Sequence, residues 1–444
     1  MSLSELWPQL TLIGSEPSFD SGPESSHIQY TDNTATWKVL YANRSQPLFV
    51  PMDITQARFA ISFFIRNPML RYWGNVLLTL DYWLPRTQLL PVVRLEHFPY
   101  HTLFGSDYLN KEARTSNIKN LNGTKIAKQL SLFCGLPGPL QKLTVYSPAP
   151  DGRLGKVAKV AMKSSAYDAI SHEAHWLKML GNSPEIAKFL PRILKQGSLS
   201  CGRYYLTMQS LPQGASPQAF GEPHFEFLHL LAQQKLSVGP WGRSQAFLRL
   251  EERTQATLPL VDDDLQNLWL DVLDEISVQI GKIELPACMI HGDFAPWNLR
   301  LIDKDLFVFD WEYAQTNGNP LQDFLHYHLV TKALQRGSLQ AEMMDTFMQK
   351  AVEYADRQFG NNTISTPQSA VKADANHNVA AACGVLTLHY LLDTMTFYVS
   401  ISGYMHYKHP VLSAYLKLLK NRSQWLPHTV TPYLKHKHLL PSVG

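Results

Sequence analysis

The sequence has little cysteine and little charge, and both shortages narrow the class of protein. Its 444 residues include four cysteines, scattered at Cys134, Cys201, Cys288 and Cys383. Their spacing fits no zinc or iron–sulfur pattern, so we expect reduced, mostly buried thiols and no disulfide framework. Charged residues make up 17% of the chain and the formal net charge is +3. This surplus is too small to predict binding to nucleic acid.

A clear targeting or membrane-spanning segment is also missing. The first twenty residues contain no basic stretch ahead of an apolar core, which predicts no signal peptide and a cytoplasmic location. Residues 380–402 are nearly all apolar, but His389 and Asp393 lie in the middle of them. Polar groups at the centre of a span are costly, so we expect a buried helix of a globular domain.

What the sequence does contain is an ordinary globular composition and one informative stretch. Hydrophobic residues make up 45%, enough for two or three packed units. Residues 288–313 read CMIHGDFAPWNLRLIDKDLFVFDWEY. Residues 288–290, 299–302 and 306–309 are apolar runs that predict short strands, with a turn at 303–305.

Three oxygen-bearing side chains follow these strands. Asp293 and Asn298 lie in the loop between the first two strands, and Asp310 closes the third. Carboxylate and amide oxygens suit Mg²⁺, so Asn298 and Asp310 are candidate metal ligands. Asp293 can accept the proton of an attacking hydroxyl, as phosphoryl transfer requires. The structural alternative is a solvated loop in which His291 and Asp293 cap turns.

These residues carry a resemblance to a known family. The run His291-Gly292-Asp293, then Asn298, then Asp310-Trp311-Glu312 resembles the aminoglycoside phosphotransferase and choline kinase group. The resemblance covers about residues 126–420. It implies an α+β, bilobal protein-kinase-like fold, with a small β-rich N-lobe and a larger helical C-lobe. It also implies that Asp293 is the catalytic base and that Asn298 and Asp310 bind the metal.

A lysine and a glutamate upstream form a second candidate pair. Lys159 lies inside an apolar strand at 156–162, and a helix follows it, for which Ser164 or Ser165 is the expected cap. Glu173 falls on the apolar stripe of this helix, where an unpaired carboxylate would be costly. We expect Lys159 to pair with it, although Lys156 and Lys163 are rival lysines. A partly exposed pair without a function is the alternative. In kinase-like folds, such a pair lets the lysine contact the α and β phosphates.

The resemblance also suggests where the nucleotide binds. Residues 209–214 break the strand pattern and would form the hinge between the lobes. The hinge backbone holds the adenine in this family, so Met208, Gln209 and Leu211 are predicted nucleotide contacts. A hairpin at 134–139 could cover the phosphates, but its two prolines make a plain turn an equal alternative.

We divide the chain into three parts. Residues 1–125 form an N-terminal accessory region, 126–210 the kinase-like N-lobe, and 211–444 the helical C-lobe. Within the first part, residues 54–90 combine Trp and Phe with basic residues. A helical layer packed on the kinase body is the main interpretation. Weak contact with a membrane or a lipid-linked substrate is the alternative.

Together these features predict a small-molecule kinase. It would move the γ-phosphate of ATP or GTP, with Mg²⁺, to a hydroxyl of a sugar, polyol or glycan precursor. A non-catalytic nucleotide-binding or scaffold protein that keeps the fold is the alternative. The predicted partners are a nucleotide and a small hydroxylated acceptor, without nucleic acid, and the sequence does not indicate an oligomeric state.

Overall fold

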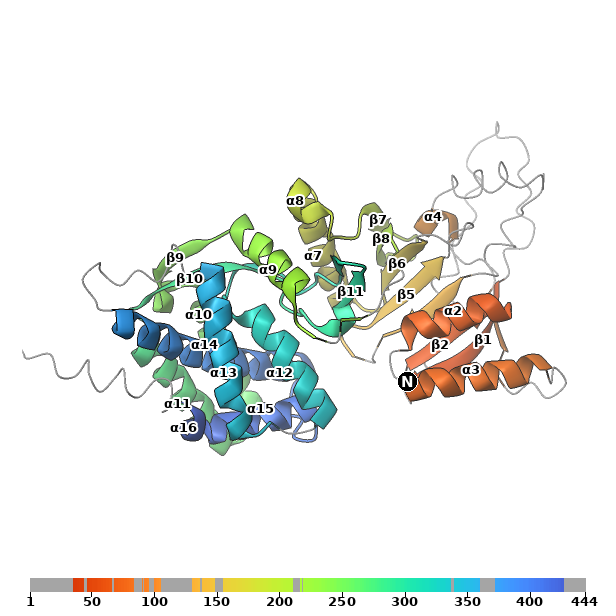
Figure 1. The fold of residues 1–444 in the computed structure, drawn as a ribbon. Coiled ribbons are helices and arrows are strands. Elements are labelled where there is room, and N and C mark those ends of the chain that lie inside the picture. Colours follow the sequence, from red (N-terminus) through yellow and green to blue (C-terminus); the bar gives the residue numbers. More distant parts are fainter. Residues whose placement is uncertain are drawn as a thin grey trace, which may run out of the picture. The chain divides into compact units, whose positions relative to one another are not determined.

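The chain forms two compact units. A computed structural model describes residues 35–426 except 44–45, 66–67, 84–89, 91, 96–99, 105–129, 136–137, 148–154, 211–215, 218, 337–338 and 360–371. The first unit contains Met1–Ala215 and Phe307–Glu312, and the second contains Ser216–Leu306 and Tyr313–Gly444. The first is built on a sheet and the second is mostly helical (Figure 1), which confirms the predicted α+β fold class.

The first unit is built on an antiparallel sheet in which the order of the strands differs from their order along the chain. Its strand order in the described residues is β3-β1-β2-β4-β5-β6-β8-β7. The strands are β1 (Ala35–Asn43), β2 (Gln46–Pro51), β3 (Val92–Leu95), β4 (Ser131–Cys134), β5 (Lys142–Ser147), β6 (Lys156–Ala161), β7 (Ile193–Ser198) and β8 (Tyr204–Gln209). Strand β2 pairs with β4, so the sheet continues across the predicted boundary at residue 125.

Alternating side chains give this sheet two buried faces. Trp37 and Val39 of β1 belong to a core that extends along the sheet to Val160. Leu40 belongs to a second core, formed with α2 (Ile54–Phe64) and α3 (Pro68–Trp83). Because neighbouring residues of a strand point to opposite faces, one strand supplies both cores.

Helix α7 (Ser164–Leu180) follows β6, as the sequence predicts. Its N-cap is Lys163, which makes no side-chain capping bond. The prediction that Ser164 or Ser165 caps the helix is therefore wrong. Ser165 instead donates a hydrogen bond to the Pro139 carbonyl oxygen at 2.6 Å, because its hydroxyl points to the preceding hairpin. The shorter helices of this unit are α4 (Tyr100–Phe104) and α8 (Pro184–Ala187).

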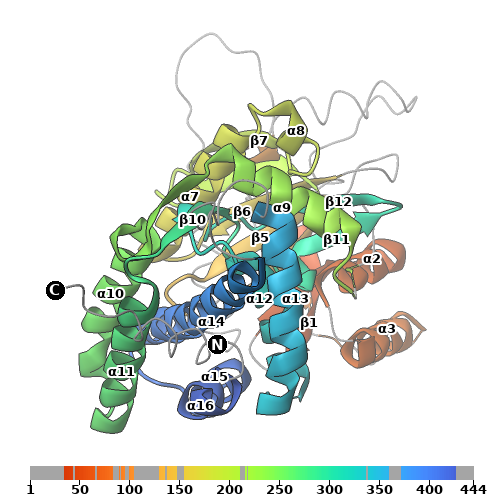
Figure 2. The ribbon, with the colours of Figure 1, turned by 60° about the vertical axis from the view of Figure 1, so that its left-hand side comes forward.

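The second unit is a helical assembly around α14 (Lys372–Ser402). Helices α10 (Gln245–Thr257), α11 (Asp263–Ile280) and α13 (Ala341–Phe359) contact it, and Figure 2 shows α14 between them. The remaining helices are α9 (Glu222–Gln234), α12 (Gln322–Arg336), α15 (Pro410–Lys420) and α16 (Arg422–Trp425). Val379–Ser402 is long and apolar enough to cross a bilayer, yet 83% of its most apolar window is buried inside the protein. Burial by neighbouring helices explains its composition.

Two small sheets hold the stretch around Asp293. Strand β10 (Glu284–Ile290) pairs with β9 (Ser237–Pro240) and with β13 (Gln315–Gly318). A hairpin of β11 (Leu299–Ile302) and β12 (Asp305–Val308) follows the loop. These strands match the three predicted from the apolar runs. Their ends fix the loop that carries Asp293 and Asn298.

Candidate active site

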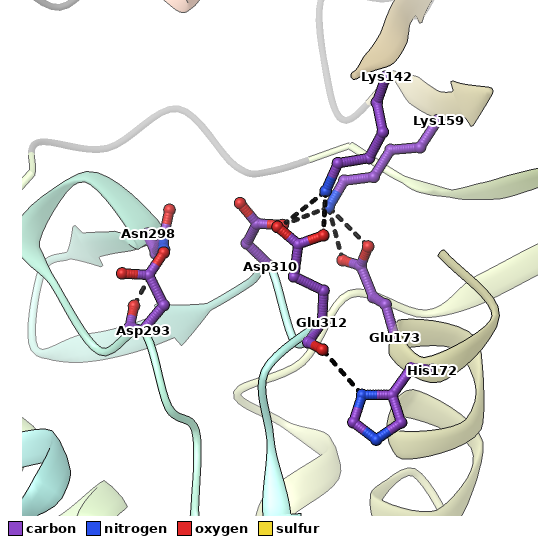
Figure 3. Close-up of polar contacts among 8 residues, drawn as sticks. All are labelled: Lys142, Lys159, His172, Glu173, Asp293, Asn298, Asp310 and Glu312. Carbon is purple, nitrogen blue, oxygen red and sulfur yellow. Dashed lines mark hydrogen bonds and ion pairs between the residues drawn. The ribbon is translucent and has the colours of Figure 1, made fainter. Parts of the chain in front are cut away.

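A buried ion cluster in the first unit is centred on Lys159. Its Nζ lies 2.7 and 2.6 Å from the two carboxylate oxygens of Glu173, which confirms the predicted pair. The same nitrogen lies 2.8 Å from Oδ1 of Asp310 (Figure 3). Glu173 is fully buried, so its charge depends on this contact. The carboxylates of Asp310 and Glu173 outweigh the effect of burial and raise the pKa of Lys159.

A second lysine joins the cluster, and the sequence analysis missed it. Lys142 of β5 forms an ion pair with Glu312 and lies 3.9 Å from Asp310 Oδ1. In the register of β5 and β6, Thr144 is opposite Lys159. Lys142 is two residues from Thr144 and therefore shares its face. Strand alternation could have identified Lys142, once the pairing register was known.

Glu312 is the third carboxylate of the cluster. Burial, reinforced by the charge of Asp310, raises its pKa to about 7, and the two lysines oppose this shift. Its backbone oxygen is 2.8 Å from Nδ1 of His172, whose other ring nitrogen accepts from Trp176 at 2.9 Å. These contacts link the segment 307–312 to α7. The cluster therefore joins two lysines to the carboxylates of Glu173, Asp310 and Glu312.

Asp310 adopts an unusual backbone conformation. Its φ is +72°, in the left-handed region that residues other than glycine rarely occupy. Asp tolerates this region better than most residues, and such conformations cluster at functional sites. The adjacent Trp311 is fully buried and donates a hydrogen bond to the Val308 carbonyl oxygen at 3.1 Å. The buried indole fixes the turn that carries the carboxylate.

In the second unit, the side chain of Asn298 donates two hydrogen bonds to Asp293. The Asn298 side-chain amide donates to the backbone oxygen of Asp293 at 2.9 Å and to its Oδ2 at 2.7 Å (Figure 3). Asp293 also accepts from Nε2 of His326 through Oδ1, at 2.8 Å. Both carboxylate oxygens thus have a defined partner. No signal in the sequence pointed to His326, which is 33 residues away on α12.

A chain of buried hydroxyl groups continues from His326. Its Nδ1 lies 3.1 Å from the Tyr390 hydroxyl, which lies 2.7 Å from the hydroxyl of Tyr415. Burial raises the pKa of both tyrosines, so their hydroxyls keep their protons. A carboxylate can only accept, so Nε2 of His326 donates to Asp293. The opposite ring nitrogen, Nδ1, faces the Tyr390 hydroxyl.

Hydrogen bonds to Asp323 hold the loop that precedes Asp293. This buried carboxylate accepts from the backbone nitrogens of His291 at 2.7 Å and Gly292 at 2.9 Å. Gly292 has a φ of +85°, and a Cβ there would lie 2.3 Å from the Tyr313 carbonyl oxygen. Only glycine fits this turn.

The amide oxygen of Asn298 is a candidate ligand for a hard cation. The Asn298 amide oxygen is buried and has no hydrogen-bond partner among the described residues, although its amide nitrogen has two. A buried acceptor without a partner is costly, and a hard cation would satisfy it. Within the described chain, no group of three or more His, Cys, Asp or Glu side chains could hold a metal.

The remaining predicted contacts lie at the end of β8. Met208 is buried, and the Gln209 backbone nitrogen donates to the Arg192 carbonyl oxygen at 2.9 Å. Leu211 lies outside the described residues. The two units separate after Ala215, one residue beyond the predicted hinge. The adenine contacts therefore stay a prediction.

His389 and Asp393 of α14 have different surroundings. His389 is buried and lies 3.3 Å from the Ala246 carbonyl oxygen, and burial lowers its pKa to about 4. Asp393 is partly exposed and forms a 2.8 Å ion pair with Arg253 of α10. His389 is thus a core contact, whereas Asp393 lies at an accessible charged cluster.

Comparisons with known proteins agree with the sequence resemblance. Residues 157–350 match the profile described as the phosphotransferase enzyme family, which confirms the resemblance over these residues. No curated protein matches the chain.

Solved structures give weak likenesses. An ethanolamine kinase of Plasmodium vivax has a TM-score of 0.43 and 10% identity, covering 73% of this chain and 90% of that one. A thermostable mutant of aminoglycoside phosphotransferase APH(4)-Ia has a TM-score of 0.42 and 15% identity, covering 66% and 94%. An aminoglycoside phosphotransferase of Streptomyces rimosus has a TM-score of 0.31 and 14% identity, covering 56% and 89%. At these TM-scores the likeness carries no argument about function.

Proposed function

We propose, from the match of residues 157–350 to the phosphotransferase enzyme family, that this protein is a small-molecule kinase. It would transfer the γ-phosphate of ATP or GTP to a hydroxyl group of a sugar, polyol or glycan precursor. The observation that carries the proposal is the contact of Lys159 with both Glu173 and Asp310. This lysine is held by two carboxylates in the arrangement that phosphate binding needs.

Each residue has a role that its surroundings support. Lys159 binds the α and β phosphates and is held in place by Glu173. Lys142 supplies a second positive charge beside it. By the sequence resemblance, Asn298 and Asp310 would each supply an oxygen ligand to Mg²⁺, which would neutralise phosphate charge when bound. Asp293, oriented by His326 and Asn298, accepts the proton of the acceptor hydroxyl.

The acceptor side of the proposal rests on a charged cluster near the catalytic loop. The Tyr313 carbonyl oxygen abuts Gly292, and the Tyr313 ring contacts Phe397 with centroids 5.1 Å apart. The Arg253 guanidinium lies 5.3 Å from the Phe397 ring. Continuous packing therefore connects the neighbour of Asp293 to α10. We place the acceptor against this packed surface, which we call the acceptor wall.

The charge of that wall disfavours a cationic acceptor. Asp393 forms an ion pair with Arg253 and acts electrostatically on Arg249, so the three groups sum to one positive charge. Among the described residues, the guanidinium of Arg249 donates one hydrogen bond, to the Asn317 carbonyl oxygen at 2.6 Å. Its other donors suit hydroxyl or acidic groups of an acceptor. A sugar, polyol or glycan precursor fits this wall better than a polyamine-like aminoglycoside.

A thermal-shift measurement tests the nucleotide part of the proposal. Mg²⁺ with ATP or GTP should raise the melting temperature of the wild type, because a ligand that binds only the folded state stabilises it. Asp310→Ala should lose most of this rise, whereas Asp305→Ala, at the exposed first residue of β12, should keep it. The absence of a rise with both nucleotides would reject the proposal. A rise without consumption of nucleotide against a panel of sugars and polyols would favour the non-catalytic alternative.

A further inference from the structure

Helix α3 presents its apolar side chains to solvent. Met69, Trp73, Leu77, Leu80 and Trp83 are 69, 55, 41, 44 and 74% exposed. They follow one another at intervals of four, four, three and three residues, so they form one stripe along the helix. We call these five residues the outer stripe. A contiguous apolar surface of this kind on a protein indicates a binding surface.

The opposite side of the same helix faces the protein. Asp81 is buried and pairs with Lys38 of β1 at 2.6 Å, and it also accepts from the Leu90 backbone nitrogen at 3.0 Å. Leu78 belongs to the core shared with α2, and Gly74 packs against Ile61. Rolling the helix to bury the outer stripe would leave the buried charge of Lys38 unpaired, which is strongly unfavourable. The orientation of α3 is therefore fixed with its apolar side outward.

Aromatic residues with polar edges flank the stripe. Tyr72 and Tyr82 are more than half exposed, next to Trp73 and Trp83 respectively. Trp and Tyr side chains combine an apolar ring with a polar atom and favour the boundary between water and lipid. In Figure 1, α3 lies beside α2 and β1. The outer stripe thus belongs to a helix that is packed against α2 and β1.

The charge around the stripe is positive. In the described parts of α2 and α3 the basic residues are Arg58 and Arg71, and the acidic residue Asp81 is already offset by Lys38. Arg58 is exposed on α2 and reaches across to α3, where it donates to the Thr79 hydroxyl at 3.0 Å. Cationic side chains beside an apolar aromatic helix are complementary to anionic lipid headgroups. A second copy of the chain fits less well, because a symmetric contact would bring like charges together.

We propose that the outer stripe binds the surface of a membrane that contains anionic lipids. The Trp and Leu side chains would enter the boundary of the acyl chains, and the nearby arginines would contact the headgroup phosphates. Helix α3 would lie in the plane of the membrane surface without crossing it. This binding does not depend on phosphoryl transfer, so it stands or falls separately from the kinase activity.

Vesicle flotation with the full chain tests the proposal. The wild type should float with vesicles of phosphatidylcholine and phosphatidylglycerol, and less with phosphatidylcholine alone. The double variant Trp73→Ser with Trp83→Ser should bind the anionic vesicles about tenfold more weakly for each residue replaced. Arg58→Gln should weaken binding at low salt and have little effect at high salt, because salt screens exposed charges.

A matched control distinguishes membrane binding through the outer stripe from nonspecific adsorption through any exposed apolar residue. Leu270 and Val278 of α11 are also exposed, at 39 and 76%, so Leu270→Ser with Val278→Ser should float like the wild type. All four substitutions are at exposed sites, and melting temperatures check that each variant folds. Failure of the wild type to float would overturn the proposal, as would equal flotation of the tryptophan variant. Self-association of the wild type that the tryptophan variant abolishes, without lipid binding, would assign the stripe to a dimer instead.

Discussion

His326 donates to Asp293 across 2.8 Å, from its Nε2 to Oδ1, and thereby holds the carboxylate that we propose as catalytic base. The ring itself is fixed by the Tyr390 hydroxyl on its other side. The side-chain amide of Asn298 donates a hydrogen bond to the second oxygen of the same carboxylate. The base is thus oriented by two donors before any acceptor arrives, which lowers the cost of reaching the reactive geometry.

Replacing His326 should reduce turnover without removing nucleotide binding. We expect His326→Ala to lower kcat about 10- to 100-fold, since a loosely held base loses part of its contribution. His326→Gln, which can donate to Asp293 through its amide, should recover part of the loss. Steady-state kinetics with ATP would show an unchanged nucleotide KM. His175→Ala, at an exposed histidine of α7, serves as a control, and an equal loss in Ala and Gln variants would argue against positioning.

Removing Lys159 should affect both binding and stability. Lys159→Met leaves Glu173 fully buried beside Asp310 without their shared cation. An uncompensated buried charge costs about 3–5 kcal/mol of unfolding free energy. Urea denaturation would measure this loss. Lys163→Met, at an exposed position before α7, should cost under about 0.5 kcal/mol, and a similar cost for both would contradict the buried cluster.

The stability of the protein should depend on pH through Glu312. Burial raises its pKa in the folded state from 4.5 to about 7, so the folded state binds more protons than the unfolded state between these values. The contribution of Glu312 is fully present below pH 4.5 and is lost as pH rises through about 7. Its size across this window is on the order of 3 kcal/mol.

Glu312→Gln should lack this pH-dependent contribution to the free energy of unfolding. Its unfolding free energy, relative to the wild type, should improve steadily as pH rises from 4.5 to 8. Chemical denaturation at several pH values would measure the difference. Glu284→Gln, at an exposed residue of β10, should show no such trend. Parallel curves for the wild type and Glu312→Gln would reject a raised pKa at this position.

Gly292→Ala should destabilise the loop that carries Asp293. The backbone there has a φ of +85°, and the added Cβ would meet the Tyr313 carbonyl oxygen at 2.3 Å. Strain of this kind costs about 1–3 kcal/mol, and turnover should fall further because Asp293 is displaced. Gly202→Ala also has a positive φ but meets no neighbouring atom, so it isolates the cost of backbone strain. Normal turnover in Gly292→Ala would contradict this account.

The sequence predicts some of these relationships better than others. The Lys159–Glu173 pair was predictable, because a strand and the helix after it are close in sequence and a carboxylate on an apolar stripe needs a cation. The partners Lys142 and Glu312 are 170 residues apart, so their contact depends on the tertiary fold. His326 was missed for the same reason. The wrong serine cap shows that a local signal can be overridden, here by the hydrogen bond of Ser165 to Pro139.

The outward face of α3 also escapes simple prediction. A helix with apolar spacing normally buries its stripe, and the sequence of residues 68–83 alone does not say which side faces the sheet. The Lys38–Asp81 pair decides this, and it joins residues of different elements. Expected strands such as 288–290 were recovered because continuous apolar runs are a direct signal of burial.

Transfer of labelled γ-phosphate tests the central claim most directly. Wild-type protein would be incubated with Mg²⁺ and γ-labelled ATP or GTP, against sugars, polyols and glycan precursors, beside Asp293→Asn. The account predicts a labelled acceptor with the wild type and essentially none with Asp293→Asn, while both still bind nucleotide. Equal transfer by the two proteins, or no label on any acceptor together with no nucleotide consumed by the wild type, would contradict it.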